Sequence, residues 1–279
     1  MKIDGRTRLL GLVGKGIEHT LSPTLHNHAL EVLGENLVYV PFEIDALDLE
    51  DLIRFFPRIG GAGLNVTTPY KAAAAAFVQA GDAETQLTGI VNTIAYRGET
   101  PLGFATDGAG FRSWMRAEGI RPGSSGVALL GFGAVARSIA FTLGQEYPLT
   151  FVSRAPRETE AVLESWRERG WPGLPVRVLS WEDPTPAQAL LTIGSLPVEA
   201  ARSGQVAEWL AGCDPTGIVV DLNYGAGRTP LRDQAKDRGL IAYDGLGLLV
   251  HQAAASLSLW LGEEVPVDLL EEGLAAGTE

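Results

Sequence analysis

The sequence predicts an α/β protein of two domains, one of which is discontinuous in the chain. The chain has 279 residues, of which 46% are hydrophobic, so it is long enough to bury two cores. Segments that read as strands and helices alternate along it, which indicates an α/β architecture. The alternation starts again near residue 109 with strands that are almost entirely apolar, and this predicts a parallel, doubly wound sheet in the second domain.

In the first half, short β-branched and apolar runs read as strands, and runs that follow helix-start residues read as helices. Helices are expected over residues 22–34, 48–60 and 69–81. Strands are expected over residues 8–14, 37–44 and 61–67, and residues 91–106 read as a hairpin. Ser22 is the expected N-cap of the first helix, with Pro23 at its first helical position.

In the second half, strand and helix segments follow one another in repeated units. Helices are expected over residues 110–119, 134–145, 158–170, 203–212 and 231–239. Strands are expected over residues 126–133, 149–154, 176–181, 217–224 and 240–245, and residues 189–194 read as a further apolar stretch. A last helix over residues 246–262 is assigned to the first domain. The predicted domains are therefore residues 1–108 with 245–279 and residues 109–244.

Composition excludes several classes of function. The formal net charge of −12 argues against nucleic-acid binding, because a phosphate backbone is bound through clustered Lys and Arg. It leaves room for small anions, which hydroxyls, backbone amides and one or two cations can hold locally. No segment reads as a membrane span, and the amino-terminal residues lack the apolar stretch of a signal peptide.

Cysteine and histidine usage is sparse. The single cysteine, Cys213, excludes an internal disulfide and a multi-cysteine zinc site, and it fits a cytoplasmic location. The histidines show no zinc-ligand spacing, so no metal is expected.

A glycine-rich turn opens the second domain. In LLGFGAVA, Gly131, Gly133 and Ala136 fit the pattern G-x-G-x-x-G/A between an apolar strand and a helix. Glycines there let the backbone approach a pyrophosphate that rests on the helix N-terminus. The alternative is a purely structural tight turn. The residues expected to contact the cofactor are Gly131, Phe132, Gly133, Ala134, Val135 and Ala136.

The end of the next strand selects the cofactor. An NAD site usually has Asp or Glu there for the ribose hydroxyls, whereas this strand ends in Ser153 and Arg154, with Arg157 close behind. A hydroxyl and two cations suit the 2′-phosphate of NADP, so NADP is favoured over NAD. The alternative is a pair of solvated loop arginines.

Lys71 stands in an unusual place. In GLNVTTPYKAA it falls in the first turn of the helix expected over residues 69–81, where the positive end of the helix dipole disfavours a charged amine. Such a lysine exchanges a proton more readily, as an alcohol dehydrogenase requires. Asp107, at another expected helix start, is a candidate partner that could orient the amine; its alternative role is that of an N-cap.

Seven motifs, in order and over nearly the whole chain, resemble those of the shikimate dehydrogenase family. They are HTLSPTLHN, NVTTPYK, GIVNT, ATDGAGF, LGFGAVA, DLNYGAGRTPL and DGLGLLVHQAAASLSLW. The resemblance implies a Rossmann-type second domain and NADP-dependent reduction of 3-dehydroshikimate to shikimate, a step toward chorismate and the aromatic amino acids.

The resemblance also implies roles for particular residues. Lys71 and Asp107 would be the catalytic pair, and Gly245 would contact the nicotinamide end of the cofactor. Thr20 and Ser22 would bind the substrate carboxylate, with Tyr224 near it. The ring hydroxyls would be bound by Asn65, Thr67, Asn92 and Gln252.

Two alternatives stay open. Thr20 stands where the family usually has Ser, and the loop over residues 192–197 departs from the family pattern, so the substrate could be quinate or an amino-substituted analogue. The other alternative is a paralogue that binds a dinucleotide or metabolite and has little turnover. The expected partner is the small-molecule substrate. The chain itself is expected to be a monomer or a homodimer.

Overall fold

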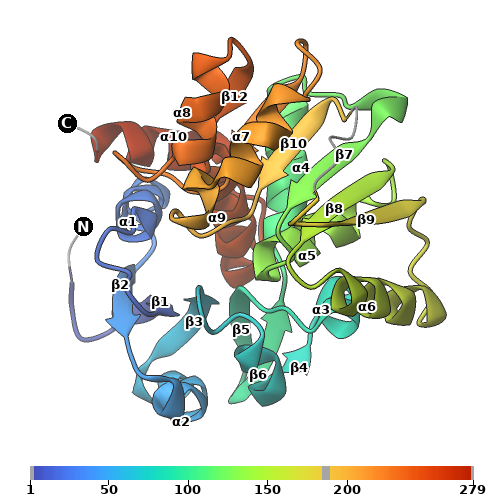
Figure 1. Ribbon diagram of the computed structural model, residues 1–279. Helices are drawn as coiled ribbons and strands as arrows, with labels where there is room; N and C mark the ends of the chain where they lie inside the picture. Colours follow the sequence, from blue (N-terminus) through green and yellow to red (C-terminus); the bar gives the residue numbers. More distant parts are fainter. Residues whose placement is uncertain (1–2, 184–188, 278–279) are drawn as a thin grey trace. The chain divides into compact units, whose positions relative to one another are not determined.

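The computed structural model describes residues 3–183 and 189–277 and confirms the predicted α/β fold class (Figure 1). The chain divides into two compact units, with divisions at Gly110/Phe111 and at Leu248/Leu249. The first unit contains the chain up to Gly110 and from Leu249 onward, and the second contains Phe111–Leu248. Each unit is built around its own sheet.

The first unit has a mixed sheet in the order β2-β1-β3-β5-β6-β4. Its strands are β1 (Arg8–Gly14), β2 (Leu37–Glu43), β3 (Gly61–Val66), β4 (Gln79–Ala80), β5 (Thr93–Arg97) and β6 (Thr100–Phe104). β1 pairs in parallel with β2 and β3, whereas β5 pairs antiparallel with β3 and β6. The β5–β6 pair confirms the predicted hairpin.

The helices of this unit are α1 (Ser22–Leu33), α2 (Leu49–Phe55), α3 (Ala83–Thr88) and α10 (Val267–Ala276), with parts of α4 (Asp107–Ala117) and α9 (Leu246–Leu261). The connections between these elements include three 3₁₀ turns of three to five residues: η1 (Ala46–Asp48), η2 (Phe56–Ile59) and η3 (Ala73–Phe77). α10 packs against α1; neither α10 nor the short α3 was expected from the sequence. The apolar core includes Leu49, Ile53, Phe56 and Leu64, all fully buried or nearly so.

Two local predictions are wrong. Ser22 is the first residue of α1 and Leu21 is its N-cap, with no side-chain capping bond from the described residues. The α-helix expected over residues 69–81 is instead a turn followed by η3 and β4. The Thr68–Pro69 peptide bond is cis, and the carbonyl of Lys71 accepts from the Val91 amide at 2.9 Å. That carbonyl is therefore bonded to a distant segment rather than along a helix.

The second unit has a parallel sheet in the order β12-β11-β10-β7-β8-β9 (green to orange in Figure 1). Its strands are β7 (Val127–Leu130), β8 (Leu149–Ser153), β9 (Val176–Ser180), β10 (Leu191–Gly194), β11 (Ile218–Asp221) and β12 (Ile241–Tyr243). Counted from β7 along the chain, this is the order 3-2-1-4-5-6 of dinucleotide-binding sheets, whose direction reverses between the first and fourth strands. The predicted doubly wound parallel sheet is confirmed.

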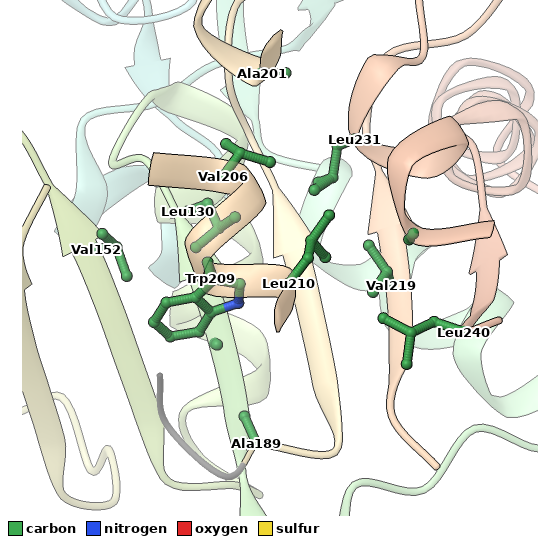
Figure 2. Close-up of a cluster of buried hydrophobic side chains, with 12 residues drawn as sticks. Leu130, Val152, Ala189, Ala201, Val206, Trp209, Leu210, Val219, Leu231 and Leu240 are labelled. Carbon is green, nitrogen blue, oxygen red and sulfur yellow. The ribbon is translucent and has the colours of Figure 1, made fainter. Parts of the chain in front are cut away.

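Helices α5 (Ala134–Leu143), α6 (Pro156–Glu168), α7 (Gly204–Ala211) and α8 (Pro230–Asp237) connect these strands, with the 3₁₀ turns η4 (Gly123–Ser125) and η5 (Ala200–Arg202). Figure 2 shows part of the core, a cluster of buried side chains that includes Trp209 of α7, Leu130 and Val152. Trp209 is 1% exposed, and its indole N–H donates to the Thr192 hydroxyl at 3.2 Å. Continuous apolar strands are what a sheet covered on both faces requires. None of the helices within residues 3–183 and 189–277 combines the length and hydropathy that a bilayer crossing needs.

Candidate active site

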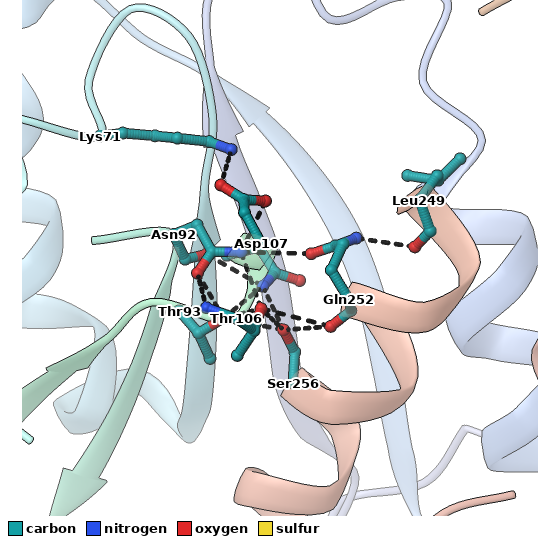
Figure 3. A network of polar contacts seen from close by, with 9 residues as sticks. Lys71, Asn92, Thr93, Thr106, Asp107, Leu249, Gln252 and Ser256 are labelled. Carbon is teal, nitrogen blue, oxygen red and sulfur yellow. Dashed lines mark hydrogen bonds and ion pairs between the residues drawn. The ribbon is translucent and has the colours of Figure 1, made fainter. Parts of the chain in front are cut away.

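A buried amine and a buried carboxylate meet in the first unit (Figure 3). Lys71 Nζ donates to Asp107 Oδ2 at 2.7 Å, and the two side chains are only 10% and 5% exposed. Lys71 lies in the turn that follows β3, and Asp107 is the first residue of α4. The α-helix expected at Lys71 is absent, so Lys71 does not stand in the first turn of a helix of its own. Its partner is a full charge within hydrogen-bonding distance, in a setting where water screens little.

Asn92 connects this pair to the rest of the site. Its amide nitrogen donates to Thr106 Oγ1 at 2.8 Å, Asp107 Oδ1 at 3.2 Å and Gln252 Oε1 at 3.3 Å. Its amide oxygen accepts from the Thr106 backbone N–H at 2.7 Å. Two amide hydrogens thus serve three acceptors, so the Asn92 side chain fixes the second oxygen of Asp107 as well as Gln252.

Asn65 lies at the end of β3 in the same network. It is 5% exposed, and its side chain bonds to groups of β2, the start of β5 and α9. Ser256 of α9 is fully buried and bonds to Asn65 and Thr93 at 3.1 and 2.7 Å. The structure therefore brings Lys71, Asp107, Asn92, Gln252 and Asn65 into one polar network, although they are far apart in the sequence.

Thr20 and Ser22 also come together. The Thr20 hydroxyl donates to Ser22 Oγ at 3.2 Å and accepts from the Ser22 backbone N–H at 3.3 Å. Thr20 lines a small cavity of about 260 Å³, with Ile17, Glu18, Pro23, Pro41 and Glu43. Thr67, in the turn after β3, is half-buried. Lys15 directly follows β1 and forms an exposed ion pair with Asp45 at 2.6 Å, so its charge is balanced locally.

The second unit presents the glycine turn at the point where its strand order reverses. Gly131 has φ +98°, and a Cβ there would come within 2.6 Å of the Ser195 carbonyl oxygen, so only glycine fits. The loop expected over residues 192–197 is wrong in its first half, because residues 192–194 belong to β10. The loop itself begins at Ser195, whose amide donates to the Leu130 carbonyl at 2.9 Å and so lies directly beside the turn. Gly133 is the N-cap of α5 and supplies no side chain there. The first N–H groups of α5 are thus available to an anion.

The other residues of this turn have packing roles as well. Ala136 is buried, and the ring of Phe132 meets that of Phe151 edge-on at 5.0 Å between centroids. The guanidinium of Arg137 lies 4.9 Å from the centroid of the Phe132 ring. Burial lowers the pKa of Arg137, and its Nε has no hydrogen-bond partner among the described residues. The G-x-G-x-x-A pattern did not indicate Arg137, which follows it immediately.

The predicted 2′-phosphate residues differ in exposure. Ser153 is 5% exposed and its hydroxyl oxygen accepts from the Ala155 N–H at 3.1 Å and from the Thr159 hydroxyl at 2.8 Å. It therefore shapes the turn between β8 and α6. Arg154 on that turn and Arg157 in the first turn of α6 are both exposed, and the described part of the chain provides no carboxylate partner for either.

Gly245 lies close to the backbone of Leu222 in the second unit, since a Cβ at Gly245 would be 2.1 Å from the Leu222 carbonyl oxygen. Tyr224, in the loop after β11, is half-buried. Its place beside a substrate carboxylate stays a prediction. No cluster of three or more His, Cys, Asp or Glu side chains within the described ranges has the arrangement of a metal site.

Four residues of the polar network were not expected from the sequence: Tyr39, Thr93, Thr106 and Ser256. Thr93 and Thr106 flank predicted residues within the motifs GIVNT and ATDGAGF, which was the available signal. Ser256 lies four residues after Gln252, on the same helix face, and this spacing could have indicated it.

A strand order that binds dinucleotides and a buried amine–carboxylate pair are together typical of dinucleotide-dependent dehydrogenases. The sequence matches the families described as "Shikimate dehydrogenase substrate binding domain" over residues 12–94 and "Shikimate 5'-dehydrogenase C-terminal domain" over residues 245–272. It is 35% identical to a shikimate dehydrogenase (NADP(+)) of Thermosynechococcus vestitus, over 100% of this chain and 99% of that protein. The chain belongs to the shikimate dehydrogenase family.

Solved structures agree with this assignment. The shikimate 5-dehydrogenase of Thermus thermophilus in complex with NADP(H) and shikimate superposes with a TM-score of 0.81 at 28% identity, covering 95% of this chain and 98% of that one. The shikimate 5-dehydrogenase of Listeria monocytogenes, in complex with shikimate and NAD, gives a TM-score of 0.83 at 25% identity and covers 98% of both chains.

Proposed function

We propose that this protein catalyses the reversible, NADP-dependent reduction of 3-dehydroshikimate to shikimate. The observation that carries the proposal is the buried Lys71–Asp107 pair, with Nζ and Oδ2 2.7 Å apart, inside a network of amides and hydroxyls. Family membership supports it, since the Thermosynechococcus relative is a shikimate dehydrogenase (NADP(+)).

The proton chemistry falls to Lys71. When the ketone is reduced, its oxygen gains a proton, which the Lys71 ammonium would donate; in the reverse direction the amine would accept it. Asp107 accepts a hydrogen bond from Lys71 and so holds Nζ in one direction. Asn92 donates to the other Asp107 oxygen at 3.2 Å and keeps the carboxylate from rotating.

The substrate would be held mainly by neutral groups. Thr20 and Ser22 are the proposed donors to the carboxylate, supported by the 3.2 Å between their hydroxyl oxygens. Asn65, Thr67, Asn92 and Gln252 are proposed to face the ring hydroxyls. Neutral donors can bind an anion in a confined site, which fits a chain of formal net charge −12.

The second unit fits a dinucleotide. Gly131 and Gly133 leave space at the N-terminus of α5, where Phe132, Ala134, Val135 and Ala136 complete the turn. Ser153 shapes the following turn, Arg154 and Arg157 would bind the 2′-phosphate, and Gly245 would adjoin the nicotinamide end. Bound NADPH supplies the hydride. We also propose a cytoplasmic location, supported by the single cysteine, and assembly as a monomer or homodimer, which sedimentation would distinguish.

The central experiment compares Lys71→Ala with the wild type. Initial rates are measured with shikimate and with quinate, and substrate binding is measured by calorimetry. Without its proton carrier, the variant should lose turnover by about 100-fold or more while shikimate binding stays within about tenfold. Lys236→Ala, which removes an exposed lysine of α8, is the matched control and should keep full activity. Undiminished turnover in Lys71→Ala would overturn the assignment of Lys71. A wild type that turns over quinate faster than shikimate would change the substrate.

A second experiment tests the cofactor. Removing one charge-assisted contact worth roughly 1.5–3 kcal/mol should raise the KM for NADP by about 10- to 100-fold in Arg154→Ala, and hardly change that for NAD. Arg167→Ala, on the last turn of α6, is the control. Equal effects of Arg154→Ala on the two cofactors would remove Arg154 from the phosphate site.

A further inference from the structure

The Asn65 carboxamide is held on both sides. Its nitrogen donates to the Asn92 carbonyl oxygen at 3.0 Å, and to the Thr93 and Ser256 hydroxyl oxygens, each at 3.1 Å. Its oxygen accepts from the Tyr39 hydroxyl at 2.8 Å. These contacts come from β2, from the segment that enters β5, and from α9.

They allow a single orientation of the amide. The nitrogen and oxygen of a carboxamide have nearly the same shape, so the partners decide which is which. A backbone carbonyl can only accept, and therefore the Asn65 nitrogen must face Asn92. The oxygen then faces Tyr39, whose hydroxyl must be the donor.

Tyr39 and Ser256 are rigid enough to maintain this arrangement. Tyr39 is 2% exposed, and its ring stacks on that of His26 with centroids 4.2 Å apart and planes 10° apart. Ser256 is fully buried and donates its own hydrogen to the Gln252 carbonyl at 2.9 Å. Its oxygen therefore acts as an acceptor toward Asn65 and Thr93, and it also lies 3.2 Å from the Thr106 hydroxyl oxygen.

The consequence is a fixed polarity. One Asn65 amide hydrogen goes to the Asn92 carbonyl, and Thr93 and Ser256 share the other. Tyr39 occupies one lone pair of the oxygen, which leaves one acceptor position and no donor. A ligand atom that meets Asn65 must therefore bring a hydrogen.

We propose that Tyr39 and Ser256 are positioning residues that make Asn65 a hydrogen-bond acceptor only, so that the site selects a ligand with a free hydroxyl or amine at that place. An ether, carbonyl or fluorine there would put two acceptors against each other, which a buried site penalises. This rests on the proposed function, which places the substrate ring beside Asn65.

The test uses ligand polarity. Calorimetry measures binding of shikimate and of analogues in which each ring hydroxyl in turn is replaced by fluorine, which is similar in size and cannot donate. One fluorinated analogue should bind the wild type about 10-fold or more weakly than shikimate, and this ratio should fall to about threefold or less in Asn65→Ala.

Tyr39→Phe and Ser256→Ala test the positioning. Each should weaken shikimate binding about fivefold, the effect of one hydrogen bond, while the same fluorinated analogue binds unchanged, so the ratio shrinks. Tyr96→Phe, which loses a hydroxyl bonded to the Ile53 carbonyl, and Ser258→Ala, outside the network on α9, are the matched controls and should leave the ratio unchanged. Thermal melting confirms that each variant is folded.

The outcomes separate the proposals. Shikimate binding with no Asn65-dependent discrimination against fluorine would overturn the acceptor-only assignment. Equal weakening of both ligands by Tyr39→Phe and Ser256→Ala would overturn the positioning roles. If the folded wild type binds no shikimate at all, the proposed function fails, and this inference fails with it.

Discussion

The two units use the ends of their strands differently. In the first unit, the groups that meet there are side chains: the amides of Asn65 and Asn92, and the charges of Lys71 and Asp107. In the second unit, the corresponding place is built from backbone, with the Gly131 turn, the Ser195 carbonyl and the N-terminus of α5. The first arrangement can distinguish the donors of a ligand from its acceptors, whereas the second leaves space at a helix N-terminus, which is what a phosphate group requires.

This difference predicts how each unit tolerates substitution. A site of side chains depends on chemical identity, and an isosteric change such as Tyr39→Phe is enough to alter it. A site that is built from backbone depends on the absence of side-chain atoms at its glycines. It also depends on an apolar core that holds the loops in place. Three measurements would sharpen the contrast.

The largest expected effect is in the apolar core of the second unit. Trp209→Ala removes a side chain that is 1% exposed and leaves the Thr192 hydroxyl without its indole donor. It should lower the free energy of unfolding by about 3–5 kcal/mol, as measured by urea denaturation. Leu47→Ala, at a residue that is 92% exposed, should change it by less than about 0.5 kcal/mol. A loss under about 1 kcal/mol in Trp209→Ala would contradict the dependence on apolar packing.

The glycine turn gives an intermediate effect with an internal control. Gly131→Ala introduces a Cβ at φ +98° and 2.6 Å from the Ser195 oxygen, and should cost about 1–3 kcal/mol of stability. Gly133→Ala meets only Ser195 Oγ at 3.8 Å and should leave stability nearly unchanged. Both should weaken NADP binding, measured by fluorescence titration, because each adds atoms where we propose that the backbone approaches the pyrophosphate. Equal stability of the two variants would show that the close approach at Gly131 is not maintained.

The effect that is smallest at pH 7 concerns His26, an exception among the paired polar groups of the first unit. Both its ring nitrogens lack hydrogen-bond partners within the described residues, and burial lowers its pKa from 6.5 to about 3. Below about pH 6.5, His26 binds a proton in the unfolded chain but not in the folded chain. Stability is therefore fully present above that pH and falls by about 1.4 kcal/mol per unit as pH decreases toward 3.

His26→Leu should flatten this part of the pH profile of stability, measured by urea denaturation between pH 7 and pH 4. His28→Gln, a variant of a half-buried histidine on the same helix, should retain the wild-type slope. If the profiles of His26→Leu and the wild type coincide, His26 does not exclude a proton in the folded chain.

Sequence patterns were sufficient for inner strands of the second sheet such as β7 and β11, because each is a short apolar run between polar turns, and local composition alone specifies a strand covered on both faces. They failed at residues 69–81, where five consecutive alanines favoured an α-helix. The carbonyl of Lys71 bonds instead to Val91, twenty residues away in the chain, and no local propensity reports such a contact. Lys71 itself was identified, although for a reason that the structure corrects.

The sequence by itself determined the fold class, the glycine turn, the family motifs and the residue types available for chemistry, because these depend on local pattern and composition. Only the tertiary structure decided which of those side chains form hydrogen bonds with one another, which oxygen of Asp107 faces Lys71, and which way the Asn65 amide is turned. Hydrogen-bond orientation depends on partners contributed by distant segments, such as Tyr39 of β2 and Ser256 of α9, and it exists only once those segments are packed together.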